Sequence, residues 1–262
     1  MKLKGILTAM ALMALAVMMG ASSCSNDKED GGDATQAADK WASLVNETKY
    51  DIQLDGTKAT YGTHTYSLME NVDGSGTINE SDYASVSFSH IPSGYTEFEA
   101  VYTALLGKSI VGTAAMIPMA MEIYARDNAT GTKCIELLCG PENASTVIRS
   151  LQSKFKATSA NADDPYIQRY LPAALLRGAT PDNAYNPYVP YTVVLRPSVN
   201  APQAVTGGTD TFLYILTFGG WDSSQRQVEI FQKTGSDHYT VYNCPSVYAQ
   251  CKPIVGTWVG LR

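Results

Sequence analysis

The chain has 262 residues, of which 25 are acidic and 19 are basic, and its formal net charge is −6 at pH 7. It contains no run of lysines and arginines, which argues against a nucleic acid as its partner. A chain of this length can bury about 70% of its unfolded surface, so we expect one main domain with at most a smaller region beside it. Composition by itself indicates no biochemical activity.

The first residues have the pattern of an export signal. Lys2 and Lys4 precede an uninterrupted, weakly apolar run over residues 6–19, which is too short to span a bilayer comfortably. Residues 1–23 are therefore predicted to be a cleaved signal peptide. The four residues ASSC, which end at Cys24, resemble a bacterial lipobox. That resemblance implies that Cys24 is lipidated and becomes the new N-terminus; ordinary secretion, with cleavage near Ala21, is the alternative.

Residues 24–36 are polar, acidic and partly glycine, a composition that predicts a flexible tether. The segment Lys28-Glu29-Asp30 resembles the acidic export signal of Bacteroidota-type surface lipoproteins, and a simple solvated spacer is the alternative. We therefore expect an outer-membrane lipoprotein that is exposed at the cell surface and attached to the membrane through its lipid. Loss of the two lysines of the leader makes the mature chain more negative by two charges.

Residues 37–80 are expected to form a small region of helix and hairpin. A short amphipathic helix is predicted over residues 37–45, where Trp41, Leu44 and Val45 are the apolar residues. Alternating patterns over residues 50–54 and 63–68, joined by a glycine-bearing link, predict a β-hairpin or a small sheet.

The stretch NVDGSGTINESD over residues 71–82 has the only metal signature in the sequence. Aligned as a twelve-residue calcium loop, it places Gly76 at the sharp turn. It resembles the calcium loops of dockerin modules, which also end in an aspartate. The candidate Ca²⁺ ligands are Asn71, Asp73, Ser75, Thr77, Asn79 and Asp82. The alternative is a glycine-rich turn that binds no metal.

Helical patterns follow. Residues 96–99 are predicted to form a capping box for a helix that ends at Gly107. Residues 109–126 are apolar on all sides and predict a central buried helix, which is kinked or restarted at Pro118. Further helices are expected over residues 133–139, over residues 142–156, and from Asp164 onward.

Residues 178–195 are the expected hinge between a helical half and a strand half. The prolines favour a polyproline II helix, which turns once every three residues, so Tyr185, Tyr188 and Tyr191 are predicted to line one face. If these rings pack on the helices, they fix the connection in place; if they are exposed, they offer a stacking surface to a sugar or a protein. We expect packing, because three exposed tyrosines would form an adhesive patch.

The hinge ends in a strand pattern at residues 192–195, and further strand patterns follow at residues 211–218, 227–231 and 238–242. Residues 254–259 are a candidate for one more strand. The predicted fold class is α+β, with a helical N-terminal half packed on a C-terminal antiparallel β-meander and a small N-terminal β-hairpin. The main domain is expected to cover residues 81–262.

The segment GATPDNAYNPYVPYTV, which begins at Gly178, resembles an uncharacterised bacterial domain family. Gly219, Gly220, Asp222 and Arg226 contribute to the same resemblance, which covers residues 83–255. The family is a domain of unknown function found in secreted and lipid-anchored proteins. The resemblance therefore implies the extent of a domain and supplies no activity.

Four cysteines remain after Cys24. Outside the cytoplasm an even number permits disulfides, and Cys244 and Cys251, which flank a short proline-containing loop, are the best candidate pair. Cys134 and Cys139 point to different faces of a predicted helix and are expected to pack as small buried residues. None of the cysteine spacings suggests a zinc site.

The motifs of nucleophilic hydrolases, zinc proteases, P-loop proteins and dinucleotide-binding proteins do not occur in the sequence. Only His64, His90 and His238 could act as a catalytic base, and a structural role is expected for His64 and His238 because both lie in alternating strand patterns. No catalytic residue is assigned. A pair of glycosidase carboxylates stays open, because such residues are close in space and not in sequence.

The turn over residues 219–226 is the best ligand-binding candidate. Its glycines allow a close approach, Trp221 offers a flat stacking surface, and Asp222 and Arg226 can orient a polar ligand. In the alternative, an Asp222–Arg226 pair merely holds the loop or anchors the tyrosine segment.

The resulting hypothesis is a lipid-anchored envelope protein that binds a ligand or partner, either a glycan or a protein, without catalysis. One alternative is a hydrolase of polysaccharide or peptide that acts through carboxylates near Trp221. A purely structural accessory subunit is the other alternative.

Overall fold

The computed structural model describes residues 52–71, 83–155, 168–198 and 202–261. All of them belong to one compact unit, Tyr50–Arg262. The lipidation site at Cys24, the tether, the predicted helix over residues 37–45 and the predicted start of a helix at Asp164 lie outside the described residues. So does the calcium motif, except for Asn71 at the end of a strand.

Along the described part of the chain, β-strands come both before and after a block of α-helices. The strands are β1 (Ile52–Asp55), β2 (Lys58–Tyr61), β3 (His64–Asn71), β4 (Tyr83–Phe88), β5 (Tyr191–Pro197), β6 (Gln203–Val205), β7 (Gly208–Leu216), β8 (Gln225–Lys233) and β9 (Tyr239–Asn243). The helices are α2 (Tyr95–Ala104), α3 (Ile110–Arg126) and α4 (Asn128–Phe155), with short 3₁₀ turns η1 (Leu106–Lys108), η2 (Ala173–Leu175) and η3 (Pro181–Asn183).

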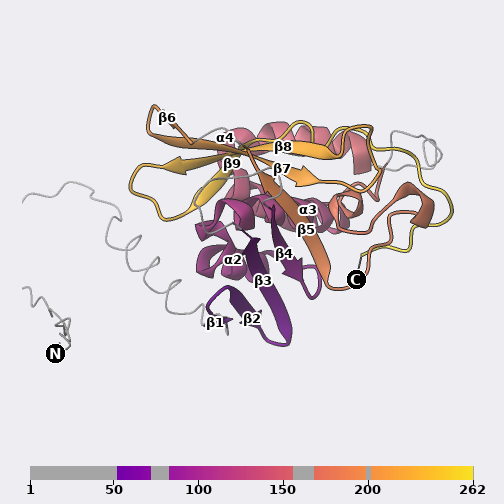
Figure 1. Ribbon diagram of the computed structural model, residues 1–262, viewed down its shortest axis with the longest axis horizontal. Coiled ribbons are helices and arrows are strands. Elements are labelled where there is room, and N and C mark those ends of the chain that lie inside the picture. Colours follow the sequence, from indigo (N-terminus) through magenta and orange to yellow (C-terminus); the bar gives the residue numbers. More distant parts are fainter. Residues whose placement is uncertain (1–51, 72–82, 156–167, 199–201, 262) are drawn as a thin grey trace, which may run out of the picture. The chain divides into compact units, whose positions relative to one another are not determined.

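All these strands join one antiparallel sheet in the order β1-β2-β3-β4-β5-β7-β8-β9, and β6 pairs with the first residues of β7 (Figure 1). The predicted α+β class is confirmed. The sheet is more continuous than expected, because β4 pairs with β5 across the whole helical block, for example at Ser87 and Thr192. Their hydroxyls lie 3.0 Å apart although the residues are 105 positions apart in the chain. The N-terminal strands therefore extend the C-terminal meander.

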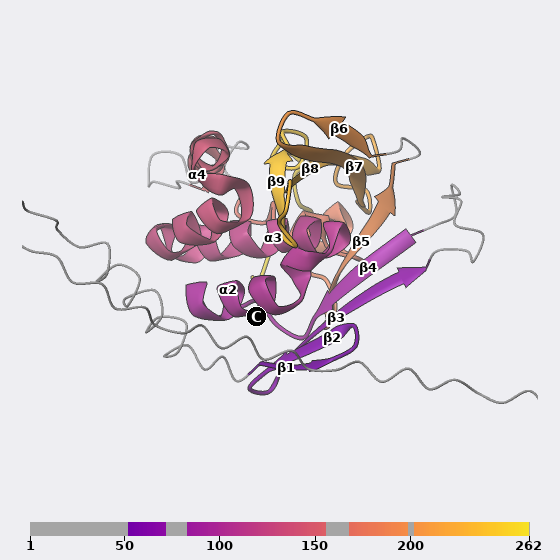
Figure 2. The same cartoon turned by 90° about the vertical axis from the view of Figure 1, so that its left-hand side faces the viewer.

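The helices cover one face of this sheet (Figure 2). Helix α3 is buried continuously from Val111 to Tyr124, as its apolar pattern predicts, and Pro118 is accommodated inside it. The span α4 contains both helices predicted there, and Gly140, whose φ of 73° is non-helical, separates them with a kink. The helical layer and the inner face of the sheet thus share one apolar core.

Two local predictions are wrong. Helix α2 begins after Gly94, so Thr96 lies inside the helix and does not cap it. Instead, the Glu97 carboxylate accepts hydrogen bonds from the backbone and hydroxyl of Ser93, four residues earlier. Residues 254–259, the candidate for one more strand, form no strand and are an irregular, partly exposed segment.

The hinge over residues 178–195 is ordered but is not a polyproline II helix. Thr180 and Asn183 form a reciprocal capping box around η3, and Ala184 and Tyr185 then take left-handed backbone angles. Side chains that bond the nearby backbone favour such turns over an extended helix. The threefold repeat of tyrosines therefore has no common face in the structure.

Candidate functional site

The three hinge tyrosines have different surroundings. Tyr185 is fully buried, stacks on Tyr170 with ring centroids 5.2 Å apart, and donates a hydrogen bond of 2.9 Å to the carbonyl oxygen of Lys252. Tyr191 is buried at the start of β5. Tyr188 is 84% exposed. Two rings thus pack inside the protein, as the packing alternative expects, and one faces solvent.

The turn between β7 and β8 also makes its main contacts within the protein. The Arg226 guanidinium lies 4.9 Å from the centroid of the Trp221 ring, whose Nε1 donates to the carbonyl oxygen of Ala249. Asp222 forms its ion pair, at 3.1 Å, with Lys252. An Asp222–Arg226 pair is therefore not what holds this loop.

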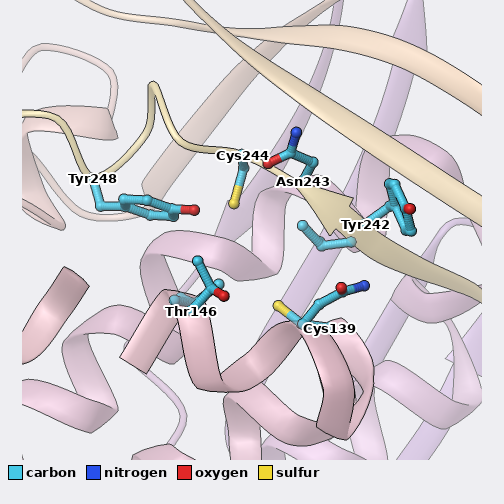
Figure 3. A pocket seen from close by; sticks show the side chains of 9 residues that line it. Cys139, Thr146, Tyr242, Asn243, Cys244 and Tyr248 are labelled. Atoms are coloured by element: carbon cyan, nitrogen blue, oxygen red, sulfur yellow. The ribbon is translucent and has the colours of Figure 1, made fainter. Parts of the chain in front are cut away.

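The four described cysteines are free and buried, and the expected disulfide between Cys244 and Cys251 is not formed. The thiol of Cys251 contacts the side-chain oxygen of Gln168, whereas the thiols of Cys244 and Cys139 both point into a cavity of about 250 Å³ between α4 and the end of β9 (Figure 3). Burial raises the pKa of Cys139 to about 12 and that of Cys244 well above its ordinary value. Such thiols stay protonated at neutral pH, so this cavity is a poor nucleophilic site.

Another group of polar side chains gathers where β3, β4 and α2 meet. The backbone N–H of Ser89 donates to the carbonyl oxygen of Thr65, and the backbone N–H of Thr65 donates to the hydroxyl of Ser89. These bonds extend the pairing of β3 with β4 by one step and bring His90 beside His64. The two imidazole ring centroids are 3.2 Å apart.

Glu97, on the first turn of α2, faces both imidazoles from a buried position with 2% of its side chain exposed. Its Oε1 lies 3.0 Å from His64 Nδ1 and 3.2 Å from His90 Nε2, and it accepts a hydrogen bond of 2.5 Å from the Tyr66 hydroxyl. Its Oε2 accepts two bonds from Ser93, at 2.7 and 2.8 Å. The carboxylate is thus fixed at both oxygens. We call His64, His90 and Glu97 the His–His–Glu cluster.

The electrostatics of the cluster favour an ionised carboxylate beside a neutral imidazole. Burial acts to raise the pKa of Glu97, but the hydrogen bonds from Ser93 and Tyr66 outweigh burial and hold that pKa below its ordinary value. Burial lowers the pKa of His90, against the opposing charge of Glu97. Burial and the neighbouring Glu97 raise the pKa of Tyr66, which therefore stays a hydrogen-bond donor.

The cluster has the composition of a metal site. One ligand atom from each of the three residues lies within 4.8 Å of the others, and within the described ranges it is the one group of its kind. His64 is 38% exposed, so a solute can reach the cluster from the His64 side. Sequence reasoning missed this site, because it assigned Glu97 to a capping box and gave His64 a structural role. No local motif connects the three residues.

Comparison with known families gives one match. A family model described as a domain of unknown function, DUF6935, matches residues 90–255. The chain belongs to the DUF6935 family. His90 and Glu97 lie inside the DUF6935 match, and His64 lies on β3, before it begins.

The other comparisons give nothing: no curated protein and no solved structure matches the chain significantly. Among the described helices, none combines the length and apolarity that crossing a membrane requires.

Proposed function

We propose that this DUF6935 protein is a lipid-anchored protein of the bacterial cell envelope, exposed at the outer surface, whose folded part is a non-catalytic binding module. The anchor is Cys24, which follows a predicted signal peptide and precedes an acidic tether. The His–His–Glu cluster is its binding site.

The observation that carries the proposal is the fixed carboxylate of Glu97. A buried carboxylate is costly unless each oxygen has partners, and here Tyr66, Ser93 and the two imidazoles surround it. Side chains held in this way keep their geometry before a ligand arrives, which lowers the entropic cost of binding. The exposed edge of His64 supplies the entrance.

The cluster is a better binding site than the turn over residues 219–226. The Arg226 guanidinium lies over the Trp221 ring, both side chains are buried, and Asp222 is paired with Lys252. The hydrolase alternative depends on carboxylates near Trp221. The carboxylate next to Trp221 in the chain, Asp222, is paired with Lys252, and this pairing argues against the hydrolase alternative. The exposed ring of Tyr188 is a second contact point, suited to stacking on a glycan or on a protein partner.

The anchor is tested by a single substitution. Cys24→Ala removes the thiol that carries the lipid, so the variant should move from the membrane fraction to the soluble fraction. Exposure at the outer surface is tested on the wild type, which should be digested by a protease added to intact cells. Continued membrane retention of Cys24→Ala would overturn the lipid anchor.

Binding is tested on the soluble chain from Ala34 onward with a panel of ions, glycans and peptides in a thermal-shift assay, run beside a panel of hydrolase substrates. A ligand that raises the melting temperature of the wild type but not of Glu97→Gln supports the proposal. Turnover of any substrate would overturn a non-catalytic role, and silence in both panels would favour the accessory subunit.

A further inference from the structure

We infer that the His–His–Glu cluster binds a late first-row transition-metal dication, with Zn²⁺ as its natural occupant. This inference rests on the proposed binding function and names the ligand of the same site. The three protein ligands are His64 Nδ1, His90 Nε2 and Glu97 Oε1.

The distances already match those between ligands of a tetrahedral zinc ion. Zn–N and Zn–O bonds of 2.0–2.1 Å at tetrahedral angles place neighbouring ligand atoms about 3.3 Å apart. Glu97 Oε1 lies 3.0 Å from His64 Nδ1 and 3.2 Å from His90 Nε2. Two of the three ligand–ligand separations therefore need almost no change when an ion enters.

The environment of His90 gives independent support. Both of its ring nitrogens are buried: Nδ1 makes no hydrogen bond within the described part of the chain, and Nε2 lies 3.2 Å from Glu97 Oε1 without the geometry of a hydrogen bond. A buried polar atom without a partner costs about 1–3 kcal/mol, so its retention needs an explanation. Coordination to a metal gives Nε2 a well-directed partner in place of its poorly aligned contact with Glu97.

Three groups converge on one oxygen of the Glu97 carboxylate. His64 Nδ1 lies 3.0 Å from Oε1, His90 Nε2 lies 3.2 Å from it, and the Tyr66 hydroxyl donates to it, although the oxygen has only two lone pairs. A cation between the two imidazoles and the carboxylate relieves this crowding. The centroids of the two rings are 3.2 Å apart without the ion, so the rings must turn away from one another when it enters.

The ligand types select the metal. Two imidazole nitrogens and one carboxylate oxygen suit Zn²⁺ and its neighbours, whereas Ca²⁺ and Mg²⁺ prefer sites made of oxygen alone. Three protein ligands leave a fourth position for water or for a ligand donor, and the 38% exposure of the His64 side chain lets such a donor reach the cluster.

Tyr66 and Ser93 act as positioning residues. They orient the Glu97 carboxylate by hydrogen bonds to Oε1 and Oε2, the role that outer partners have around metal-ligating carboxylates. Tyr66 has no exposed surface and packs edge-on against Phe88, so its hydroxyl is held in place by the core.

The test is metal binding to the full chain, purified in detergent and stripped of metal with a chelator. Isothermal titration with Zn²⁺ should give one ion per chain. His64→Ala should weaken binding by more than about 100-fold, and Tyr66→Phe by about 10- to 100-fold. A Co²⁺-loaded sample should show the visible absorption of a four-coordinate site without a sulfur-to-metal band, which separates the cluster from the cysteines.

His238→Ala is the matched control, because His238 also contacts a carboxylate, Asp237 at 2.6 Å, but the pair belongs to no three-residue group in the described part. Its affinity for Zn²⁺ should equal that of the wild type. Absence of saturable binding to the wild type would overturn the inference, as would equal losses in His238→Ala and His64→Ala. Cys24→Ala tests the anchor separately, so failure to bind Zn²⁺ leaves that part of the proposed function standing.

Discussion

Glu122 is a buried carboxylate in the middle of an otherwise apolar helix, with arginines on two sides. Arg126 Nε lies 2.8 Å from Oε1, and Arg169 Nη1 lies 2.9 Å from Oε2. Arg126 also donates to the carbonyl oxygen of Leu261, and Arg169 lies over the ring of Trp258. One carboxylate in α3 thus holds the segment after α4 and the C-terminal segment against the helical layer.

Replacement of this carboxylate by an amide should lower stability. We expect Glu122→Gln to lower the free energy of unfolding by about 1–3 kcal/mol, because two guanidinium groups lose a charged partner while their exposed sides remain hydrated. Glu142→Gln, an exposed position on α4, should change it by less than about 0.5 kcal/mol. Urea unfolding measures both variants, and similar losses in the two would contradict the role given to Glu122.

The roles of single residues are harder to predict from the sequence than whole helices and strands are. Nothing in the local pattern marks Glu97 as buried, since a glutamate near a helix start is typical of an exposed capping residue. Its true role depends on Tyr66 and His64, which lie on β3 and reach it only after the sheet and α2 pack together. The same holds for Trp221, whose partner Ala249 lies 28 residues away.

Among the elements, α3 and α4 make an unusually close crossing at Gly131. A methyl group at this position would lie 2.0 Å from the Cα of Tyr124, a backbone atom that cannot move aside on its own. The absence of a side chain at Gly131 therefore sets how closely the two helices approach.

Gly131→Ala separates packing from helix propensity, because the two effects have opposite signs. Alanine favours an isolated helix over glycine by about 1 kcal/mol, whereas a forced shift of two packed helices costs about 1–3 kcal/mol or more. We expect a lower melting temperature. Glu136→Ala, at an exposed position of α4, should leave it nearly unchanged. A melting temperature of Gly131→Ala at or above that of the wild type would show that the crossing is loose.

Elements with a strong periodic pattern were predictable, and those decided by side-chain bonds or distant pairing were not. The apolar runs of α3 and β7 and the alternation in β8 and β9 correspond to the observed elements, because burial of a helix or strand generates those patterns. The hinge departs from its proline pattern, because Asn183 and Thr180 bond the local backbone. The pairing of β4 with β5 leaves no local trace, since each strand accepts many partners.

On the scale of the whole molecule, the four buried thiols connect its stability to pH. Burial raises the pKa of Cys134, Cys139 and Cys251 to about 12, and that of Cys244 well above its ordinary value of 9.0. They come from α4, from the end of β9 and from the C-terminal segment, so unfolding of the compact unit exposes all of them.

The sign of the effect follows from linkage. The folded protein keeps these thiols protonated, whereas the unfolded chain ionises them near pH 9, so above that pH the unfolded state holds fewer protons and gains stability. The contribution is fully present below about pH 9 and is lost as the pH rises towards 12. At pH 10.5 each of Cys134, Cys139 and Cys251 should lower the free energy of unfolding by about 2 kcal/mol relative to pH 8.

Cys134→Ala measures the contribution of one thiol to this loss of unfolding free energy, because Cys134 is fully buried and alanine has no titrating group. Urea unfolding at pH 8 and pH 10.5, both with reductant, should show that the variant loses about 2 kcal/mol less than the wild type between the two pH values. The small cavity left by the thiol lowers stability equally at both pH values and cancels in the difference, as do the tyrosines common to both proteins. Equal losses in the two proteins would mean that this thiol ionises in the folded state, and hence that the core around α4 admits water at alkaline pH.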